Sequence, residues 1–130
     1  AIYLSDTADE VNQKVMSMYT DPDHIHITDP GKIEGNMVFT YLDLFAADVE
    51  HVTELKQQYQ HGGLGDVKIK RYLAEILNAE LDPIRAKRAE YEADIASVYD
   101  ILRVGSERAN EVANQTLAEV RAAIGFNYFN

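Results

Sequence analysis

Apolar residues recur every three or four positions along most of this chain, and that spacing limits it to a fold built from helices. Val11, Val15 and Met18 form one such set near the start, and Val52, Leu55 and Tyr59 form another further on. No segment alternates apolar and polar residues convincingly enough to build a sheet. The sequence therefore predicts an all-α fold, a bundle of five to seven helices with short links.

Capping residues predict where the first three helices begin and end. Ser5, Asn36 and Asp48 are polar residues that precede apolar runs, so we expect them to cap three helices. The middle helix should bury Val38, Tyr41, Leu42 and Phe45. Gly62 and Gly63 should end the third helix, because glycine adopts the left-handed backbone without a steric penalty.

The second half of the chain predicts longer helices. A helical pattern starts at Asp66 and continues to about residue 92, with Pro83 expected to kink it or break it in two. We expect a short helix over residues 96–104 and a last helix that is capped by Ser106 and ended by Gly125. The tail that follows carries three aromatic residues that are expected to fold back onto the bundle, namely Phe126, Tyr128 and Phe129.

The net charge of −10 argues, taken globally, against a nucleic-acid ligand, because phosphate binding needs local positive charge. The charge is unevenly spread, however. Residues 1–60 hold 11 acids and 3 bases, whereas residues 61–90 hold 5 acids and 6 bases. Half of the 12 basic residues therefore fall between Lys68 and Arg88. An acidic chain with one basic segment can still meet a polyanion through that segment.

On a helix, two pairs of these bases share a face. Lys68 and Arg71 are three residues apart, as are Arg85 and Arg88. The alternative is an ordinary solvated helix surface, with ion pairs to Glu75 and Glu92. The full segment comprises Lys68, Lys70, Arg71, Arg85, Lys87 and Arg88.

Gly62, Gly63 and Gly65 precede the helix that starts at Asp66. Backbone N–H groups of such a loop can contact phosphate, and no side chain obstructs the approach. The segment lacks the Gly-Lys-Ser/Thr ending of a phosphate-binding P-loop, and the Asp66 carboxylate would repel phosphate. A turn between two helices is therefore the favoured interpretation.

Residues 21–29, in the loop over residues 20–36, contain three aspartates and two histidines. Their spacing fails the calcium-loop pattern, because Ile25 and His26 stand where an oxygen ligand and a glycine are needed. His24 and His26 have no third ligand nearby for zinc. A solvated turn is favoured and no metal site is predicted. No Ser-His-Asp set is present, and the absence of cysteine excludes a thiol nucleophile and a disulfide framework.

Five segments in uninterrupted order resemble bacterial tryptophanyl-tRNA synthetases, in the region directly after their KMSKS motif. The similarity extends over essentially the whole chain. Several segments in the right order are more specific than one short motif. Tyrosyl-tRNA synthetases are the nearest confusable family, with a helical domain of similar shape. The segments are residues 1–20, Asp29–Asn36 with the helix that follows, Gln58–Lys70, Leu81–Arg85 and Gly105–Ala113.

The resemblance implies that residues 1–130 form the C-terminal helical domain, which in this family of class I aminoacyl-tRNA synthetases binds the tRNA anticodon region and pivots against the catalytic domain. The HIGH and KMSKS motifs are not in the sequence, and the chain starts with Ala1 rather than Met. We therefore expect the Rossmann catalytic domain to be absent, and the fragment to be inactive and to hold no cofactor. The face that packs on the Rossmann domain in the intact enzyme should then be left exposed as an apolar patch.

For the intact enzyme, the resemblance implies tryptophan–tRNA ligase activity with ATP and Mg²⁺. It also implies a cytoplasmic location, no membrane association and a homodimer that forms through the missing domain. For the fragment it implies tRNA contacts at Lys68, Lys70 and Arg71 beside the loop of Gly62, Gly63 and Gly65, with Arg85 and Arg88 secondary. Two other functions stay open: a helical protein-interaction module with no RNA role, and a small enzyme with a carboxylate site.

Overall fold

The computed structural model describes residues 1–126, which contain five α-helices and no strand. The all-α prediction is confirmed, with the helix number at the lower end of the expected range. The chain divides into two compact units, residues 1–86 and 87–130. The assignment of all 130 residues to one functional domain stays a prediction. The helices are α1 (Ala8–Met16), α2 (Met37–Phe45), α3 (Val49–His61), α4 (Asp66–Ala93) and α5 (Ile95–Ala123).

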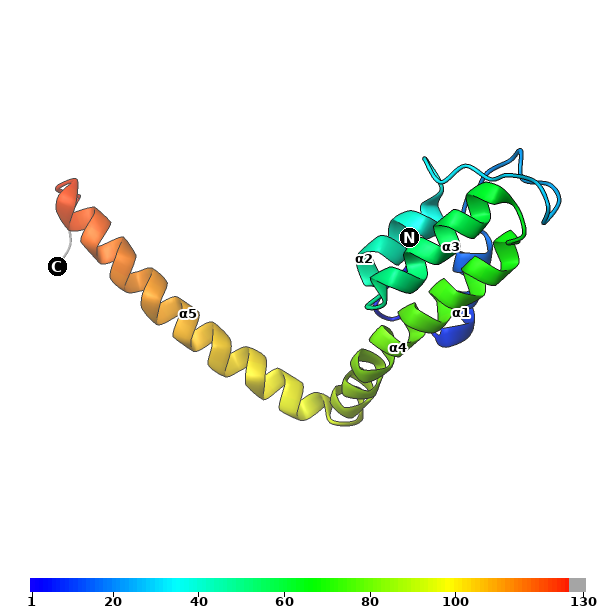
Figure 1. Ribbon diagram of the computed structural model, residues 1–130. Helices are drawn as coiled ribbons and strands as arrows, with labels where there is room; N and C mark the ends of the chain where they lie inside the picture. Colours follow the sequence, from blue (N-terminus) through cyan, green and yellow to red (C-terminus); the bar gives the residue numbers. More distant parts are fainter. Residues whose placement is uncertain (127–130) are drawn as a thin grey trace. The chain divides into compact units, whose positions relative to one another are not determined.

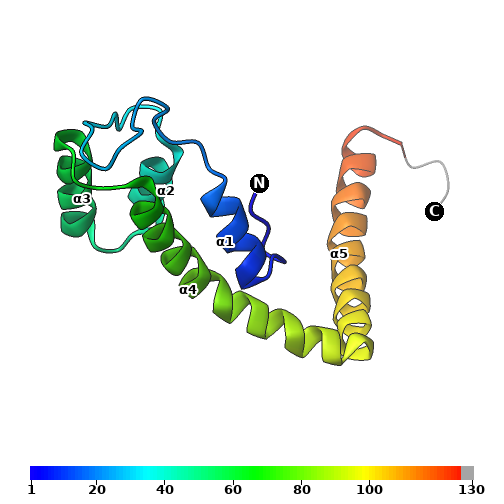
Figure 2. The ribbon, with the colours of Figure 1, turned by 90° about the vertical axis from the view of Figure 1, so that its right-hand side faces the viewer.

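The core of the first unit forms where α1, α2, α3 and the first part of α4 pack together (Figures 1 and 2). Each helix contributes apolar residues at helical spacing, as predicted for Val11 and Val15 of α1 and for Tyr59 of α3. Phe45 was expected to be buried and is not: it is 44% exposed, because α2 ends there and its last turn leaves the core. The buried apolar residues are Val11, Val15, Val38, Phe39, Leu42, Val52, Leu55, Tyr59, Leu64, Ile69, Leu73, Ala74, Leu77 and Leu81.

The predicted caps of α2 and α3 are confirmed, whereas that of α1 is wrong. Asn36 Oδ1 accepts a hydrogen bond from the backbone N–H of Val38, and Asp48 Oδ1 accepts one from the N–H of His51. The first helix is capped by Thr7 rather than Ser5, in a reciprocal capping box with Glu10. That box satisfies the backbone N–H groups of both residues, which a serine two positions earlier cannot do.

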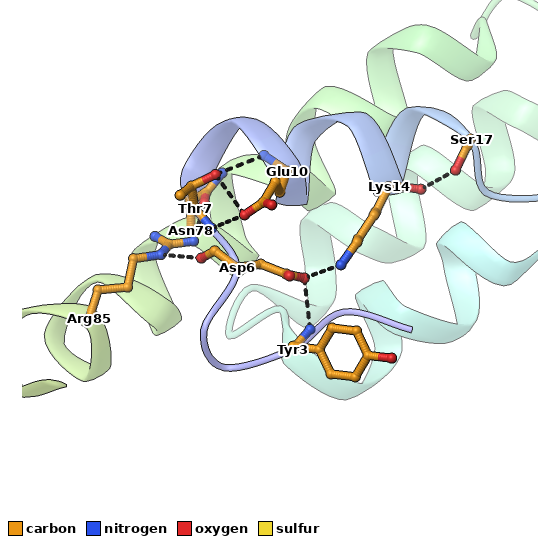
Figure 3. A network of polar contacts seen from close by, with 8 residues as sticks. All are labelled: Tyr3, Asp6, Thr7, Glu10, Lys14, Ser17, Asn78 and Arg85. Carbon is orange, nitrogen blue, oxygen red and sulfur yellow. Dashed lines mark hydrogen bonds and ion pairs between the residues drawn. The ribbon is translucent and has the colours of Figure 1, made fainter.

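Asp6 instead joins the N-terminal segment to α1 and α4 (Figure 3). Its carboxylate accepts hydrogen bonds from the backbone N–H of Tyr3 at 2.8 Å and from the Lys14 ammonium at 2.6 Å. Its backbone carbonyl accepts one from Arg85 Nε at 2.8 Å. Lys14 first, and then the Tyr3 N–H, hold the pKa of Asp6 below its ordinary value.

The helix α4 runs through Pro83, which excludes a break at that residue; a kink, the other predicted outcome, stays a prediction. Proline removes one hydrogen bond of the helix ladder, but the Arg85 guanidinium spans the position. It donates to Asn78 Oδ1 at 2.8 Å and to Asp82 Oδ1 at 2.7 Å, in addition to the Asp6 carbonyl. These bonds hold both sides of the proline in the helical path.

In the second unit, α5 is one helix rather than two (Figure 2). Its cap is Asp94, whose carboxylate accepts a hydrogen bond from the Ser97 N–H, and the cap predicted at Ser106 is wrong. Gly105 does not interrupt the helix, and an ion pair between Arg103 and Glu107 spans it. The expected end at Gly125 is confirmed, with a φ of +69°.

No residue of α5 is buried among those that the structure describes. Large apolar side chains therefore lie in solvent on this helix, which fits the expectation of an exposed apolar surface. Phe126, which follows it, is 59% exposed. The predicted packing of Tyr128 and Phe129 lies outside the described residues.

Gly31 allows a close approach that predicts a sharp mutational effect. A Cβ atom at this position would lie 2.2 Å from the ring of the buried Tyr59. We expect Gly31→Ala to lower the free energy of unfolding of the first unit by about 1–3 kcal/mol, because a packed core resists added volume. Urea unfolding followed by NMR signals of core methyl groups measures this.

The matched control for that substitution is Gly105→Ala, where nothing lies within 4 Å of the added Cβ. It should leave the first unit unchanged and raise the helicity of α5, since alanine favours a helix interior over glycine by about 1 kcal/mol. Equal stability of Gly31→Ala and the unsubstituted chain would contradict the packing described here.

The Asp6 contacts predict a dependence of stability on pH. Because the pKa of Asp6 is lower in the folded chain than in the unfolded one, its contribution is fully present above the unfolded value of about 3.9. The contribution is lost as pH falls through the folded pKa. Asp6→Asn should therefore destabilise the first unit at pH 7 and have a smaller effect at pH 2–3, as measured by urea midpoints. Glu34→Gln, at an exposed position, is the control and should show no such convergence.

Candidate nucleic-acid interface

The turn between α3 and α4 needs its glycines because the loop over residues 20–36 passes close to it. Gly62 has a φ of +84°, and a Cβ there would lie 2.3 Å from the carbonyl oxygen of Thr28. Gly63 has a φ of +108° and donates its N–H to the Ile27 carbonyl. A Cβ on Gly65 would lie 3.2 Å from Ile27 Cγ1. The three glycines therefore let the turn lie close to the loop, and the side chain of Leu64 between them is buried in the core.

Asp66, at the start of α4, uses its carboxylate to hold the loop and α3 together. One oxygen accepts a hydrogen bond from the Tyr59 hydroxyl at 2.8 Å, and the other accepts one from the Thr20 hydroxyl at 2.7 Å. Burial of Tyr59 first, and then its hydrogen bond to Asp66, raise the pKa of the phenol above its ordinary value. Both carboxylate oxygens are therefore engaged with protein hydroxyls.

His24 is a structural residue at the same junction. It is 8% exposed, its Nε2 donates to the Leu64 carbonyl at 2.9 Å, and its ring lies 4.5 Å from that of Tyr59. His26 is exposed. Within residues 1–126 there is no group of three or more histidine, cysteine or carboxylate side chains that could hold a metal ion. His24 therefore packs within the junction while His26 faces solvent, and neither belongs to a metal-ligand set among the described residues.

A hollow of about 640 Å³ opens beside the glycine turn. The predicted site residues Lys68 and Arg71 line it together with Gly63 and Gly65, whereas Gly62 faces the loop. Its other walls come from α3, α4 and the loop. They are formed by Ile27, His51, Leu55, Val67, Tyr72 and Glu75.

Lys68 and Arg71 are exposed and make no side-chain hydrogen bond or ion pair with any residue in 1–126 that the structure describes. This distinguishes them within the first unit. Lys14, Lys32, Lys56 and Arg85 each lie within 2.7 Å of a carboxylate oxygen. Lys70 donates to the Met16 carbonyl at 3.1 Å. Positive charge is therefore available to a ligand at the hollow, while elsewhere in this unit it is paired with acids or bonded to the backbone.

The other three predicted contacts do not join this pair at the hollow. Arg85 is largely buried, with 20% of its side chain exposed, and its guanidinium holds Asp6, Asn78 and Asp82. Arg88 lies in the second unit and pairs with Glu92 at 2.7 Å. Lys70 points to the end of α1. The basic segment of the sequence is thus not one continuous patch.

Sequence reasoning missed the walls of the hollow. Ile27 lies far from α4 in the sequence, and only the hydrogen bonds between the loop and the glycine turn bring it there. His51 and Tyr72 meet edge to face, with ring centroids 5.1 Å apart, although they lie on different helices. Glu75 was considered only as an ion-pair partner, yet it makes no ion pair with a described residue. No local pattern signals such a junction.

Comparison with known proteins decides the family. Residues 1–82 match the family of tRNA synthetases class I (W and Y). The chain belongs to this family. No helix among the described residues is long and apolar enough to cross a membrane.

The curated relatives are tryptophan–tRNA ligases. That of Clostridium longisporum is 62% identical over the whole chain, and that of Streptococcus pneumoniae TIGR4 is 60% identical over 99% of it. The chain covers only 38% of the length of each. The crystal structure of tryptophanyl-tRNA synthetase from Campylobacter jejuni matches 96% of this chain with a TM-score of 0.79 and 26% identity, over 40% of its own length. The resemblance found in the sequence is therefore confirmed.

The hydrogen bonds that Asp66 accepts from Tyr59 and Thr20 predict the effect of removing one hydroxyl. Tyr59→Phe should lower the free energy of unfolding of the first unit by about 1–3 kcal/mol, because a buried hydrogen bond to a carboxylate is lost. Urea unfolding followed by NMR of core methyl groups measures the change. Tyr99→Phe, at a position that is 69% exposed, is the control and should have no effect on that unit.

Proposed function

We propose that this chain is the tRNA-binding C-terminal part of a tryptophan–tRNA ligase, and that it meets tRNA at the hollow beside the glycine turn. The observation that carries this proposal is the pair formed by Lys68 and Arg71. They are the side chains of the first unit whose positive charge has no protein partner among residues 1–126. A phosphate backbone needs such unpaired cations, and glycines at the rim allow it to approach closely.

The electrostatics of the unit support a local contact rather than a broad one. The body is acidic, so a polyanion is repelled except where cations are free. Gly63 and Gly65 add no side chains to the rim, and the Asp66 carboxylate is engaged with Tyr59 and Thr20. RNA would therefore approach along the turn and the first part of α4.

For the whole synthetase we propose the activity of its relatives, which are named tryptophan–tRNA ligases. It would attach tryptophan to its tRNA through an aminoacyl-adenylate, with ATP and Mg²⁺, in the cytoplasm. A Rossmann domain and a homodimer contact would be supplied by parts of the protein other than these residues. A second structure from Campylobacter jejuni is a complex with ADP and tryptophan. No described residue of this chain is assigned to ATP, to tryptophan or to a metal.

The second candidate function is a helical protein-interaction module. The exposed apolar side chains of α5 favour it, since an apolar surface of this kind is typical of a contact with another protein. This function does not account for the unpaired cations at the hollow. The tRNA proposal accounts for those cations and agrees with the family.

Salt dependence of tRNA binding tests the proposal. Affinity of the chain for its cognate tRNA should fall as salt rises, because each phosphate contact releases counterions. Replacing Lys68 and Arg71 together by alanine should weaken binding and make the plot of log K against log salt shallower by roughly 1.5–2. Fluorescence anisotropy with labelled tRNA measures both quantities.

Arg103→Ala is the control, because Arg103 lies in the second unit and is paired with Glu107 at 3.1 Å. It should leave both affinity and slope nearly unchanged. If the double variant bound tRNA with the same affinity and slope as the unsubstituted chain, the hollow would not be the contact.

A further inference from the structure

The helix α2 is apolar on all sides, although the core covers only one side of it. Seven of the nine residues in Met37–Phe45 are apolar. Val38, Phe39 and Leu42 are buried, and they form the side that packs in the first unit. A helix that is apolar all round is typical of one that protein surrounds. The sequence of α2 therefore indicates a second covering surface.

The uncovered side of α2 is a continuous apolar face, which we call the α2 outer face. Its residues follow the spacing i, i+4, i+7 and i+8, so they share one side of the helix. They are Met37, Tyr41, Leu44 and Phe45. Leu44 is 73% exposed, and Met37 and Phe45 are exposed as well. The rings of Tyr41 and Phe45 are stacked with their centroids 6.0 Å apart, which gives the face a flat aromatic surface.

The part of the chain that carries this face is strongly acidic. Residues 1–60 hold 11 acids and 3 bases. Each of the three lysines lies 2.6 Å from a carboxylate oxygen, so none of them offers free positive charge. Glu34 and Asp48 lie within three residues of the two ends of the face, and neither forms an ion pair with a described residue. A protein that covers the face therefore has to bring positive charge.

A second copy of this chain does not supply that charge. Two outer faces in contact would bring the same acids together, and like charges across an interface are unfavourable. The helix α5 also exposes apolar side chains, but it carries four acids and three bases and has no surplus of positive charge. The acids repel a phosphate backbone as well, which disfavours RNA. The charges favour a basic segment of a different protein.

We infer that the α2 outer face binds an amphipathic helix of another protein, whose polar side carries lysine or arginine. The apolar side of such a helix packs along α2 with an anchor every three or four residues, and its basic side chains meet Glu34 and Asp48. Met37 can adapt its shape to the partner, and the stacked rings bury a large area. No residue of the face lines the hollow beside the glycine turn, so this contact is separate from the proposed tRNA contact.

A peptide made of leucine and lysine tests the inference on the full 130-residue chain. Its leucines recur at helical spacing, so it forms a basic helix with one apolar side. A second peptide has the same composition, but its leucines are spread around the helix. We expect the amphipathic peptide to bind about 10-fold more tightly, because only this peptide can cover the face. Isothermal titration calorimetry measures both affinities, and NMR shifts of the Met37 and Leu44 methyl groups locate the contact.

Leu44→Gln should weaken binding of the amphipathic peptide about 10-fold, because it removes the most exposed apolar side chain of the face. Ile25→Gln is the matched control. Ile25 is an apolar residue of similar exposure, but it lies in the loop over residues 20–36. This variant should leave the affinity unchanged.

The charge of the partner is tested by Glu34→Lys, which should weaken binding of the amphipathic peptide because it places a cation at the end of the face. Glu111→Lys changes the net charge by the same amount, but it lies in α5. Any general attraction between an acidic chain and a basic peptide falls equally in the two variants. A larger loss of affinity in Glu34→Lys is therefore expected, and equal losses would contradict a contact at this place.

Three other results would overturn the inference. The first is equal binding of the two peptides, or NMR shifts confined to residues outside α2. The second is dimerisation of the chain that Leu44→Gln abolishes, since the face would then bind a second copy. The third is a full-length tryptophan–tRNA ligase with these 130 residues as its C-terminal part that fails to bind the peptide, because the rest of the enzyme would then cover the face. None of these results bears on the tRNA contact at Lys68 and Arg71.

Discussion

The hydrogen bonds of the Asp66 carboxylate are the contact on which the first unit depends. One acidic side chain joins three pieces of chain, because its oxygens accept from Thr20 at the start of the loop and from Tyr59 near the end of α3, while its own backbone begins α4. A half-buried carboxylate needs such partners to offset the loss of water. His24 and Gly31 then pack against the same tyrosine. The glycine turn and the loop are held in contact as a result.

The engagement of Asp66 with Tyr59 and Thr20 also determines where positive charge is left unpaired. The carboxylate nearest to the glycine turn is satisfied by hydroxyl groups, which leaves the cations of the next helical turn without an acidic partner. Elsewhere in the first unit, lysines and arginines are paired with acids that are close in space, except Lys70, which bonds to a backbone carbonyl. A chain with a net charge of −10 can therefore present a small positive surface without a large excess of basic residues. The functional surface follows from how the acids are engaged.

Much of the fold could be predicted from the sequence, because helix signals are local. The spacing of Val11 and Val15 and the caps at Asn36 and Asp48 act within one or two turns, and all of them are confirmed. The errors arise where a distant contact or a neighbouring side chain overrides a local rule. Pro83 does not break α4, since Arg85, which follows it, bonds to Asn78 and Asp82, which precede it. Ser5 loses the cap to the reciprocal bonds of Thr7 and Glu10.

The site was predictable only in part for the same reason. Lys68 and Arg71 share a helix face with local spacing, so the sequence places them together. Gly63 and Gly65, which the sequence places beside them, line the same hollow. Arg85 has the same charge but a different role, because its guanidinium bonds to Asp6. The two residues are close in space but lie at opposite ends of the first unit in the sequence, so no local pattern predicts the bond. The walls of the hollow come from three elements that meet through tertiary contacts, and no residue spacing encodes such a meeting.

No described residue of α5 is buried, and this affects how the chain unfolds. A helix that buries nothing is stabilised by its own backbone ladder and by pairs such as Arg103–Glu107, which contribute a few tenths of a kcal/mol each. Its amide hydrogens should exchange with solvent far faster than those of α3 or the first half of α4, which the core protects. The chain therefore has no single free energy of unfolding. Its two units should therefore unfold with separate free energies.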